Sequence, residues 1–492
     1  MDVSFVLEGL VVLAAIVMGT RSGGVGVGLW GGLGTAILVF VFGEAPGEPP
    51  AAAMAIILAV VTTAALMQAA GGVDWMVAMA ARVIEKRPNQ ITLIAPLTAF
   101  VFSIGAGTSN IIYPLLPVIY DVSYRNNIRP SRPLTVTVVQ SGIALAASPV
   151  SAAMAAMLTL TEVAPYNLGL TEILAITIPA CVVAIIVTAL VVNRMGKELD
   201  EDPEVQALIA SGALAAPGAG AGTTTATSPA TAVAGVGTTT SGTDTASAGS
   251  TAVADAPPQP PVDPTPASAA LTYTSRGRNS ALAFFAGVVV IVLLGLFPDL
   301  RPSFPVEGEG TVPIDMTTTI VLVMFTAAVA ILFLGRPPVQ DVPDQSVFKA
   351  GMVSAIALFG IAWMTATFIS AHEEFIINTI GGWVNDYKFL FALAVFLVAA
   401  LTTSQSTATR TIVPIGLAAG LAPGLVTGMW AGALGGVYVL PANGTQIAAA
   451  NFDLTGTTKL GTKLLDHSFF VPNLILSVTA VVVGSVIGLI FF

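Results

Sequence analysis

Apolar runs of about twenty residues recur along almost the whole chain, and each is long enough to cross the ~30 Å hydrocarbon core of a bilayer. Only 9% of the 492 residues are Asp, Glu, Lys or Arg, against about 25% in soluble proteins. The sequence therefore predicts an all-α polytopic membrane protein. A net charge of −10 argues against nucleic acid as a partner. The runs are 4–20, 22–43, 51–70, 134–160, 172–192, 280–297, 316–335, 350–370, 424–442 and 468–492.

Two further apolar stretches, 91–120 and 389–420, do not fit as simple crossings. Basic clusters lie on both sides of 91–120, and because Lys and Arg favour cytoplasmic loops, a single crossing would put one cluster on the wrong side. The stretch is also broken near its centre. We therefore expect a re-entrant hairpin there. The clusters are Arg82, Lys86 and Arg87 before it and Arg125, Arg129 and Arg132 after it, and the breaks are Gly105, Gly107, Pro114 and Pro117.

The stretch 389–420 is expected to be a matching hairpin on the other side, since the one cation at its ends, Lys388, lies near Asp386. With two hairpins, the chain makes about ten crossings and both termini are periplasmic. Fifteen of the eighteen Lys and Arg then lie inside, and only Arg301 and Lys388 lie outside. Arg410 lies within a hydrophobic segment.

Each half then contains three crossings, a hairpin and two more crossings, with opposite orientations. This is an inverted-topology repeat, as in many secondary transporters, with one repeat at 1–199 and the other at 276–492. Residues 200–275 are rich in Ala, Thr, Ser, Gly and Pro, a composition that predicts a disordered cytoplasmic linker. Residues 74–87 resemble an interfacial amphipathic helix.

Arg410 is the strongest candidate for a substrate contact. No acid lies within twenty residues of it, and a cation inside a membrane segment costs a few kcal/mol and usually marks a ligand or ion path. The guanidinium group binds a carboxylate through two parallel hydrogen bonds. The alternative is an Arg that reaches the interface or pairs with a distant acid.

Polar side chains gather at the centre of each hairpin. Broken backbone within a membrane is tolerated only where it is buried in protein or lines a cavity, and two helix N-termini there would favour an anion. Packing of small residues is the alternative. The residues are Ser404, Gln405, Ser406, Thr407 and Thr409 in the second hairpin, and Gly105, Gly107, Thr108, Ser109 and Asn110 in the first.

A proline also interrupts the span after each hairpin, next to further polar residues. Pro149 lies beside Ser148 and Ser151, and Pro441 precedes Asn443 and Thr445. A kink that only relieves packing explains each of them equally well alone. Their matched positions in the two halves favour a shared role in a site.

Other motifs do not indicate an enzyme. The glycines at 26, 28 and 31 match a dinucleotide-binding pattern but lie within an apolar segment, where close helix packing explains them better. The lone Cys181 excludes a cysteine metal cluster within one chain, and His372 and His467 are expected at span ends. No cofactor and no nucleophile–base pair is indicated.

Several motifs in order resemble the anaerobic C4-dicarboxylate transporter (Dcu) family of the DcuA/DcuB type. The resemblance covers nearly the whole chain apart from 200–275. It implies exchange or uptake of succinate, fumarate, malate and aspartate across the bacterial inner membrane, with periplasmic termini. The motifs are GAGTSN (105–110), LPVIYDV (116–122), IRPSRPL (128–134), ASPVSAAM (147–154), FKAGM (348–352), TTSQSTAT (402–409), VLP (439–441), DLTGTTKLG (453–461) and DHSFFVP (466–472).

This sequence departs from the family pattern at the expected site. Family members often have Gly at the Ser109 position, Tyr-Pro at Ala442 and Asn443, and Lys at the Arg410 position. The choice among C4 acids therefore stays open. The family also resembles the wider ion-transporter superfamily, from which an elevator motion follows as a hypothesis.

We therefore expect a C4-dicarboxylate transporter in the bilayer, with Arg410 on one carboxylate. The two polar clusters and the residues beside Pro149 and Pro441 would hold the other carboxylate or, near Ser109, Asn110 and Ser406, a sodium ion. Alternatives are a sodium-coupled symporter of another small organic anion and a dicarboxylate-binding channel or sensor. A homo-oligomer follows only by analogy.

Overall fold

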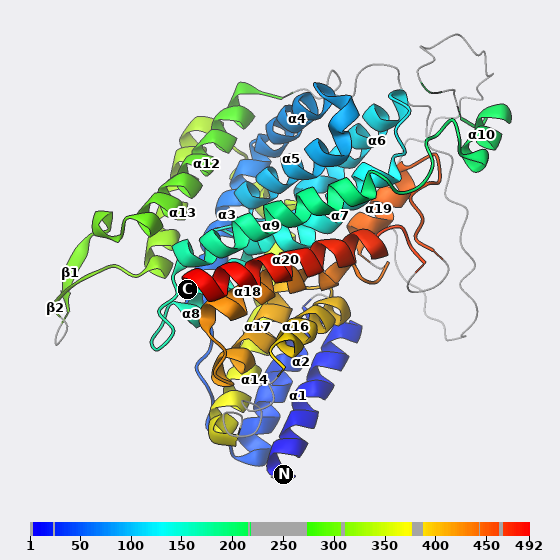
Figure 1. Cartoon of the computed structure of the whole chain (residues 1–492). Helices are drawn as coiled ribbons and strands as arrows, with labels where there is room; N and C mark the ends of the chain where they lie inside the picture. Colours follow the sequence, from blue (N-terminus) through cyan, green and yellow to red (C-terminus); the bar gives the residue numbers. More distant parts are fainter. Residues whose placement is uncertain are drawn as a thin grey trace, which may run out of the picture.

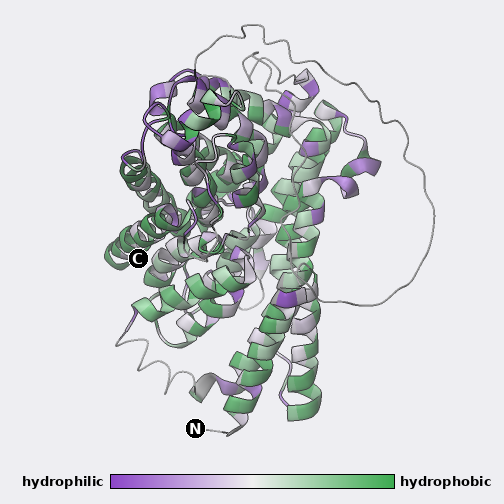
Figure 2. Cartoon of the chain, turned by 90° about the vertical axis from the view of Figure 1, so that its right-hand side faces the viewer, coloured by the Kyte–Doolittle hydropathy of each residue, from purple (hydrophilic) through white to green (hydrophobic). Residues whose placement is uncertain are grey.

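The computed structural model describes residues 3–22, 25–214, 217, 273–306, 310–375, 387–441, 443–461 and 466–492. Within these residues, eight helical segments are long and apolar enough to cross a membrane, and three shorter helices are also apolar. Hydrophobic residues cover most of each helix in Figure 2, while hydrophilic residues gather mainly at the end of the molecule away from both termini. The expected all-α membrane fold is confirmed. The number of crossings and their orientation stay predictions.

Both halves have the same order of elements. In the first half, three helices precede a hairpin, a span broken into two helices and one long helix, with the additional helix α4 (Gly72–Glu85) just before the hairpin. These are α1 (Val3–Ser22), α2 (Gly26–Ile37), α3 (Ala51–Ala69), the hairpin α5 (Ile91–Ala106), η3 (Ser109–Leu115) and α6 (Leu116–Arg125), the broken span α7 (Ser131–Ala144), η4 (Leu145–Ala147) and α8 (Ala152–Thr161), and α9 (Leu170–Val192).

The second half repeats this order. Its elements are α12 (Ser275–Leu296), α13 (Met316–Gly335), α14 (Ser346–Phe375), the hairpin α16 (Phe389–Thr402) and α17 (Gln405–Ala418), the broken span α18 (Pro423–Ala433), η8 (Leu434–Tyr438) and α19 (Gly444–Phe452), and α20 (Phe470–Phe491). Between α12 and α13, the short strands β1 (Ser303–Val306) and β2 (Gly310–Pro313) pair antiparallel, with Ser303 opposite Pro313, and extend beyond the helices in Figure 1. The remaining described elements are helix α10 (Pro203–Ala210) and the short 3₁₀ and π turns η1 (Leu38–Phe42), η2 (Pro88–Gln90), η5 (Pro298–Leu300) and η6 (Val339–Asp344).

The first three helices of each half form one group, which we call the scaffold group (α1, α2, α3, α12, α13 and α14). The halves are interlocked there, because α2 packs on α14 and α13 packs on α3. A methyl group on Gly360 would overlap the carbonyl of Gly28, and one on Gly31 would overlap the backbone of Gly360. The glycines at 28 and 31 therefore permit backbone contact between α2 and α14, which confirms the packing interpretation of this motif.

The hairpins, the broken spans and the last long helix of each half form a second group, the core group (α5–α9 and α16–α20). Here α18 packs on α20, and α20 packs on α9. The two groups meet where α14 contacts α17 and where α3 contacts α8. Figure 1 shows α1 and α2 at one end of the molecule, α12 and α13 at its side, and the core helices between them.

Two sequence interpretations need correction. Helix α4 (Gly72–Glu85) is amphipathic as expected, but its apolar face, with Met76, Ala80 and Ile84, is buried against protein rather than lipid. Helix α10 (Pro203–Ala210) occupies the start of the range 200–275, so disorder is the wrong expectation for those residues. Residues 215–216 and 218–272 lie outside the described residues.

Candidate functional site

At the tips of the two hairpins, the backbone passes through the same series of conformations. The first arm ends at a residue with positive φ, Gly107 (66°) or Thr403 (49°). The next residue is extended, and its hydroxyl caps the helical turn that follows. Thr108 Oγ1 accepts a hydrogen bond from the Asn110 N–H (3.2 Å), and Ser404 Oγ accepts one from the Thr407 N–H (3.2 Å).

The first broken span is interrupted at Pro149, and its second helix begins after Ser151. The residue before a proline favours an extended backbone, and Ser148 has this conformation (φ −98°, ψ 121°). Ser151 then caps α8, because its Oγ accepts from the Met154 N–H (3.0 Å) and donates to the Leu145 carbonyl (2.6 Å). The expected kink is thus a complete interruption in which α8 starts anew.

The second broken span ends and restarts in a similar way. Asn443 caps α19 in a capping box with Gln446. Its neighbour Thr445 donates a hydrogen bond from Oγ1 to the Tyr438 hydroxyl (3.1 Å), which lies 2.6 Å from Ser141 Oγ on α7. The two broken spans are therefore linked to each other inside the core group.

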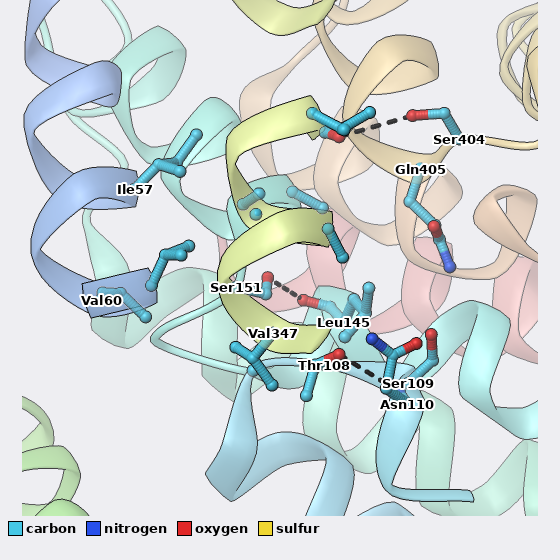
Figure 3. Close-up of a pocket in the computed structure, with 18 of the residues that line it drawn as sticks. Ile57, Val60, Thr108, Ser109, Asn110, Leu145, Ser151, Val347, Ser404 and Gln405 are labelled. Carbon is cyan, nitrogen blue, oxygen red and sulfur yellow. Dashed lines mark hydrogen bonds between the residues drawn. The ribbon is translucent and has the colours of Figure 1, made fainter. Parts of the chain in front are cut away.

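A cavity of about 330 Å³ lies between the scaffold group and the hairpin tips. Its polar lining comes from the core group and its apolar lining mainly from α3 and α14. Figure 3 shows Ile57 and Val60 of α3 on one side, and Ser404, Gln405, Ser109 and Asn110 on the other. The polar side chains are Thr108, Ser109, Asn110, Ser151, Thr402, Thr403, Ser404, Gln405, Ser406 and Thr407.

Every described side chain that lines this cavity is uncharged. Helices α8 and α17 both begin at it, through Ala152 and Gln405. Free N–H groups and the positive end of the helix dipole favour negative charge at such a position. The cavity thus presents hydroxyls, amides and two helix N-termini, a set suited to a small anion.

Arg410 lies just behind the cavity lining rather than in it. It follows Thr407 by three residues on α17, which places both on the same side of the helix. The residue is 4% exposed, and Nε and Nη2 have no hydrogen-bond partner among the described residues. Long helical side chains lean toward the helix N-terminus, which here is the cavity end. The structure therefore places an unpaired buried cation one turn from the cavity.

Four other expected site residues do not line the cavity and instead form hydrogen bonds within the protein. Thr409 accepts a hydrogen bond from Trp430 Nε1 (2.8 Å) and donates to the Gln405 carbonyl (2.7 Å). Ser148 donates to the Ile104 carbonyl of the first hairpin (2.6 Å). Asn443 and Thr445 do not line the cavity either. The sequence reveals that these positions are polar but not which way they face.

Sequence reasoning missed two features. The first is the apolar wall, where residues such as Ile57 and Val353 meet the polar tips. The second is a buried pair in the scaffold group, in which Glu8 Oε2 lies 2.9 Å from His372 Nε2. Glu8 lies within the apolar run 4–20, and this position was the signal in the sequence for such a pair. His372 was expected to lie at the end of a span rather than to contact an acid.

The chain matches the family model described as "Anaerobic c4-dicarboxylate membrane transporter" over residues 4–492. It is 32% identical over 493 residues to the anaerobic C4-dicarboxylate transporter DcuB of Escherichia coli O157:H7, covering 99% of this chain and 98% of that protein. It is 30% identical over 484 residues to the C4-dicarboxylate transporter DcuA of Helicobacter pylori, covering 97% of each.

One solved structure with a similar arrangement is the YdaH transporter of Alcanivorax borkumensis (TM-score 0.48, 12% identity, 89% of this chain and 85% of that one). Another is MtrF of Neisseria gonorrhoeae (TM-score 0.49, 11% identity, 93% and 84%). The family match extends over both hairpins, both broken spans and the cavity between them. The chain belongs to the anaerobic C4-dicarboxylate membrane transporter family.

Proposed function

We propose that this protein is a secondary transporter that carries C4-dicarboxylates across the bacterial inner membrane and binds them in the cavity between the hairpin tips. The observation that carries this proposal is the pairing of that uncharged polar cavity with the unpaired Arg410 behind it. The names of the DcuA and DcuB relatives support the substrate class.

The size and the charge of the site fit a small dianion. Ligand sites commonly span roughly 300–1,000 Å³, so about 330 Å³ suits a short substrate. A buried cation without a partner is destabilising, and an anionic substrate relieves that cost. In this binding mode, Arg410 holds one carboxylate. Hydroxyls of Ser404 and Thr407 and the N-termini of α8 and α17 hold the other.

The two walls of the cavity have different roles in this proposal. The core group supplies the hydrogen-bonding groups, while the described side chains of α3 and α14 that line the cavity are all apolar. Substrate bound only by the core group can move with it against the scaffold group. This division supports the elevator motion suggested by the family resemblance.

Exchange of dicarboxylates is the proposed mode of transport, and sodium-coupled uptake is the alternative. The residues considered for sodium, Ser109, Asn110 and Ser406, all line the cavity. We further propose that both termini are periplasmic and that the range after α10 is cytoplasmic. This orientation rests on the distribution of Lys and Arg.

The test is radiolabelled succinate uptake into proteoliposomes that contain fumarate or no dicarboxylate, with and without an inward sodium gradient. Exchange predicts uptake only into vesicles loaded with fumarate, independent of sodium. Uptake driven by sodium into empty vesicles would replace exchange by symport. Absence of succinate flux under all conditions, with the protein folded, would contradict the substrate class.

A further inference from the structure

Helix α20 carries two buried polar side chains without partners. Asn473 is fully buried, and neither Oδ1 nor Nδ2 has a hydrogen-bond partner among the described residues. Ser477, one turn later, is 3% exposed, and its Oγ is also unpartnered. Buried polar groups in folded proteins almost always have a partner, an ordered water or an ion. An amide with both atoms unsatisfied therefore indicates a bound water or an ion.

Both side chains point at the same glycine. A Cβ on Gly435 would lie 2.1 Å from Ser477 Oγ and 3.3 Å from Asn473 Oδ1. Gly435 belongs to η8, the 3₁₀ turn that follows the end of α18 at Ala433. Two oxygens of α20 thus lie against the interrupted backbone of the second broken span, at a position where a larger residue would collide with Ser477 Oγ.

Helices α7 and α9, which both pack on α20, also carry buried oxygens without a partner among the described residues. On α7, which packs on both η8 and α20, Gln140 Oε1 and Thr137 Oγ1 are buried without a partner. On α9, Thr188 lies seven residues after Cys181, whose sulfur approaches the Ile143 carbonyl of α7 at 3.5 Å. Residues seven apart share a helix face, so Thr188 also faces α7.

The chemistry of this set favours a small monovalent cation. We call the set the α20 polar cluster: Thr137, Gln140, Thr188, Asn473 and Ser477. All but one of its unpartnered atoms are neutral oxygens, whereas calcium and magnesium sites usually include carboxylates. The C-terminal end of α18 adds partial negative charge, and ends of broken helices coordinate sodium in other transporters.

We propose that the α20 polar cluster binds a sodium ion inside the core group. This site differs from the hairpin-tip position considered above, because neither Asn473 nor Ser477 lines the cavity. The ion belongs to the part of the protein that carries the substrate. Its binding does not depend on which anion is transported.

The test is thermal unfolding of the purified full-length protein in detergent, without dicarboxylate, in NaCl, KCl or choline chloride at one ionic strength. A ligand that binds only the folded state raises Tm with its concentration, so we expect Tm to be higher in NaCl. Ser477→Ala is expected to raise the half-maximal sodium concentration about tenfold, as for loss of one contact at a metal site. Asn473→Leu is expected to abolish the sodium effect.

Two control variants make the result specific. Thr177→Val removes another buried, unpartnered hydroxyl, which lies about 16 Å from Thr188 along α9, and should leave the sodium effect intact. Ser109→Ala, at the first hairpin tip, should also leave it intact. Equal Tm values in all three salts would overturn the proposal. So would a sodium effect that survives Ser477→Ala but disappears in Ser109→Ala.

Discussion

The two hairpins have matching backbones and different chemistry. Each reverses at a residue of positive φ followed by an extended residue whose hydroxyl caps the next turn. The first continues as the 3₁₀ turn η3, interrupted by Pro114, and contains no charged side chain near its tip. The second continues as the fourteen-residue helix α17, which holds the buried Arg410.

The two tips therefore share a backbone frame but not a charge. Both line one cavity, and helices α8 and α17 begin on its polar side. In the proposed binding mode, a substrate with two carboxylates would meet a guanidinium group at one end and neutral groups at the other. Similar backbones with unequal side chains would then let the site distinguish the two ends of its substrate.

Removing the charge of the second hairpin should have the largest effect. Arg410→Ala is expected to lower succinate exchange in proteoliposomes by about 100-fold or more, since loss of a buried charged hydrogen-bond partner costs roughly 2–5 kcal/mol. Arg410→Lys should retain part of the activity, because the charge remains while the paired donors are lost. Membrane levels should equal those of the unaltered protein.

Arg125→Ala is the matched control. Arg125 forms an exposed ion pair with Asp121 on α6, and such pairs contribute little, so exchange should stay within about twofold of the unaltered protein. Normal exchange by Arg410→Ala would remove the residue from the site. The unequal roles of the hairpins would then need another explanation.

The second prediction concerns the turning residue of each tip. Gly107→Ala should destabilise the protein by about 2 kcal/mol, because a side chain there has an unfavourable positive φ. The new Cβ would also lie 2.6 Å from the Val150 carbonyl. Thr403→Gly should change stability by less than about 1 kcal/mol, since it relieves the same strain but adds chain entropy. Thermal unfolding in detergent measures the stability of both variants. Equal changes in stability would contradict the predicted difference between the two tips.

Three interruptions of the fold were predictable from sequence because each depends on local chemistry: Pro149 and Pro441 remove backbone donors, and Gly107 permits positive φ. The reversal at Thr403 was not, because a β-branched residue disfavours positive φ. Helix α10 also had a local signal: Asp202 followed by Pro203 is a common helix start. The composition of the whole range 200–275 does not reveal this helix start, because most of the range is rich in Ala, Thr, Ser, Gly and Pro.

Which polar residues reach the cavity was not predictable in this way. Ser404 and Thr409 belong to the same cluster, yet Ser404 lines the cavity while Thr409 bonds to Trp430. Their directions depend on how α17 packs against α18, a contact that the chain pattern does not encode. The apolar face of α4 was misassigned for a similar reason, because hydrophobicity alone does not distinguish lipid from protein.

The third prediction compares the capping hydroxyls of the two tips. Ser404 Oγ accepts from both the backbone N–H and the hydroxyl of Thr407 (3.2 and 2.9 Å), whereas Thr108 Oγ1 accepts only from the Asn110 N–H. Loss of a cap costs about 1 kcal/mol. Ser404→Ala should therefore reduce exchange about fivefold, and Thr108→Ala should reduce it less. The reverse order would show that the first tip dominates binding.

The smallest effect is expected at the base of the first hairpin, where Arg129 forms an ion pair with Asp202 at the start of α10. The segment that follows the second hairpin, residues 419–422, contains no cation that could form a corresponding ion pair. Burial opposes the charge of Asp202, but hydrogen bonds from Arg129 and from the Glu204 N–H outweigh it and hold its pKa below the usual range. Because the pKa of Asp202 is lower in the folded protein, its pair with Arg129 stabilises the fold above the pKa of the unfolded chain, about 3.9. This stabilisation is lost as pH falls through the lower pKa of the folded protein.

Asp202→Asn should therefore lower stability at pH 7 by about 1 kcal/mol, because the amide oxygen can still accept a hydrogen bond from Arg129 while the charge of this largely buried pair is lost. The difference from the unaltered protein should shrink as pH falls below about 3.9, where Asp202 becomes protonated first in the unfolded chain and then, at lower pH, in the folded protein. Glu201→Gln removes the same charge from the neighbouring residue and serves as the control. Thermal unfolding of the three proteins between pH 7 and pH 3 measures the effect. Equal loss in both variants would assign it to net charge, and the first hairpin would then be no more firmly held at its base than the second.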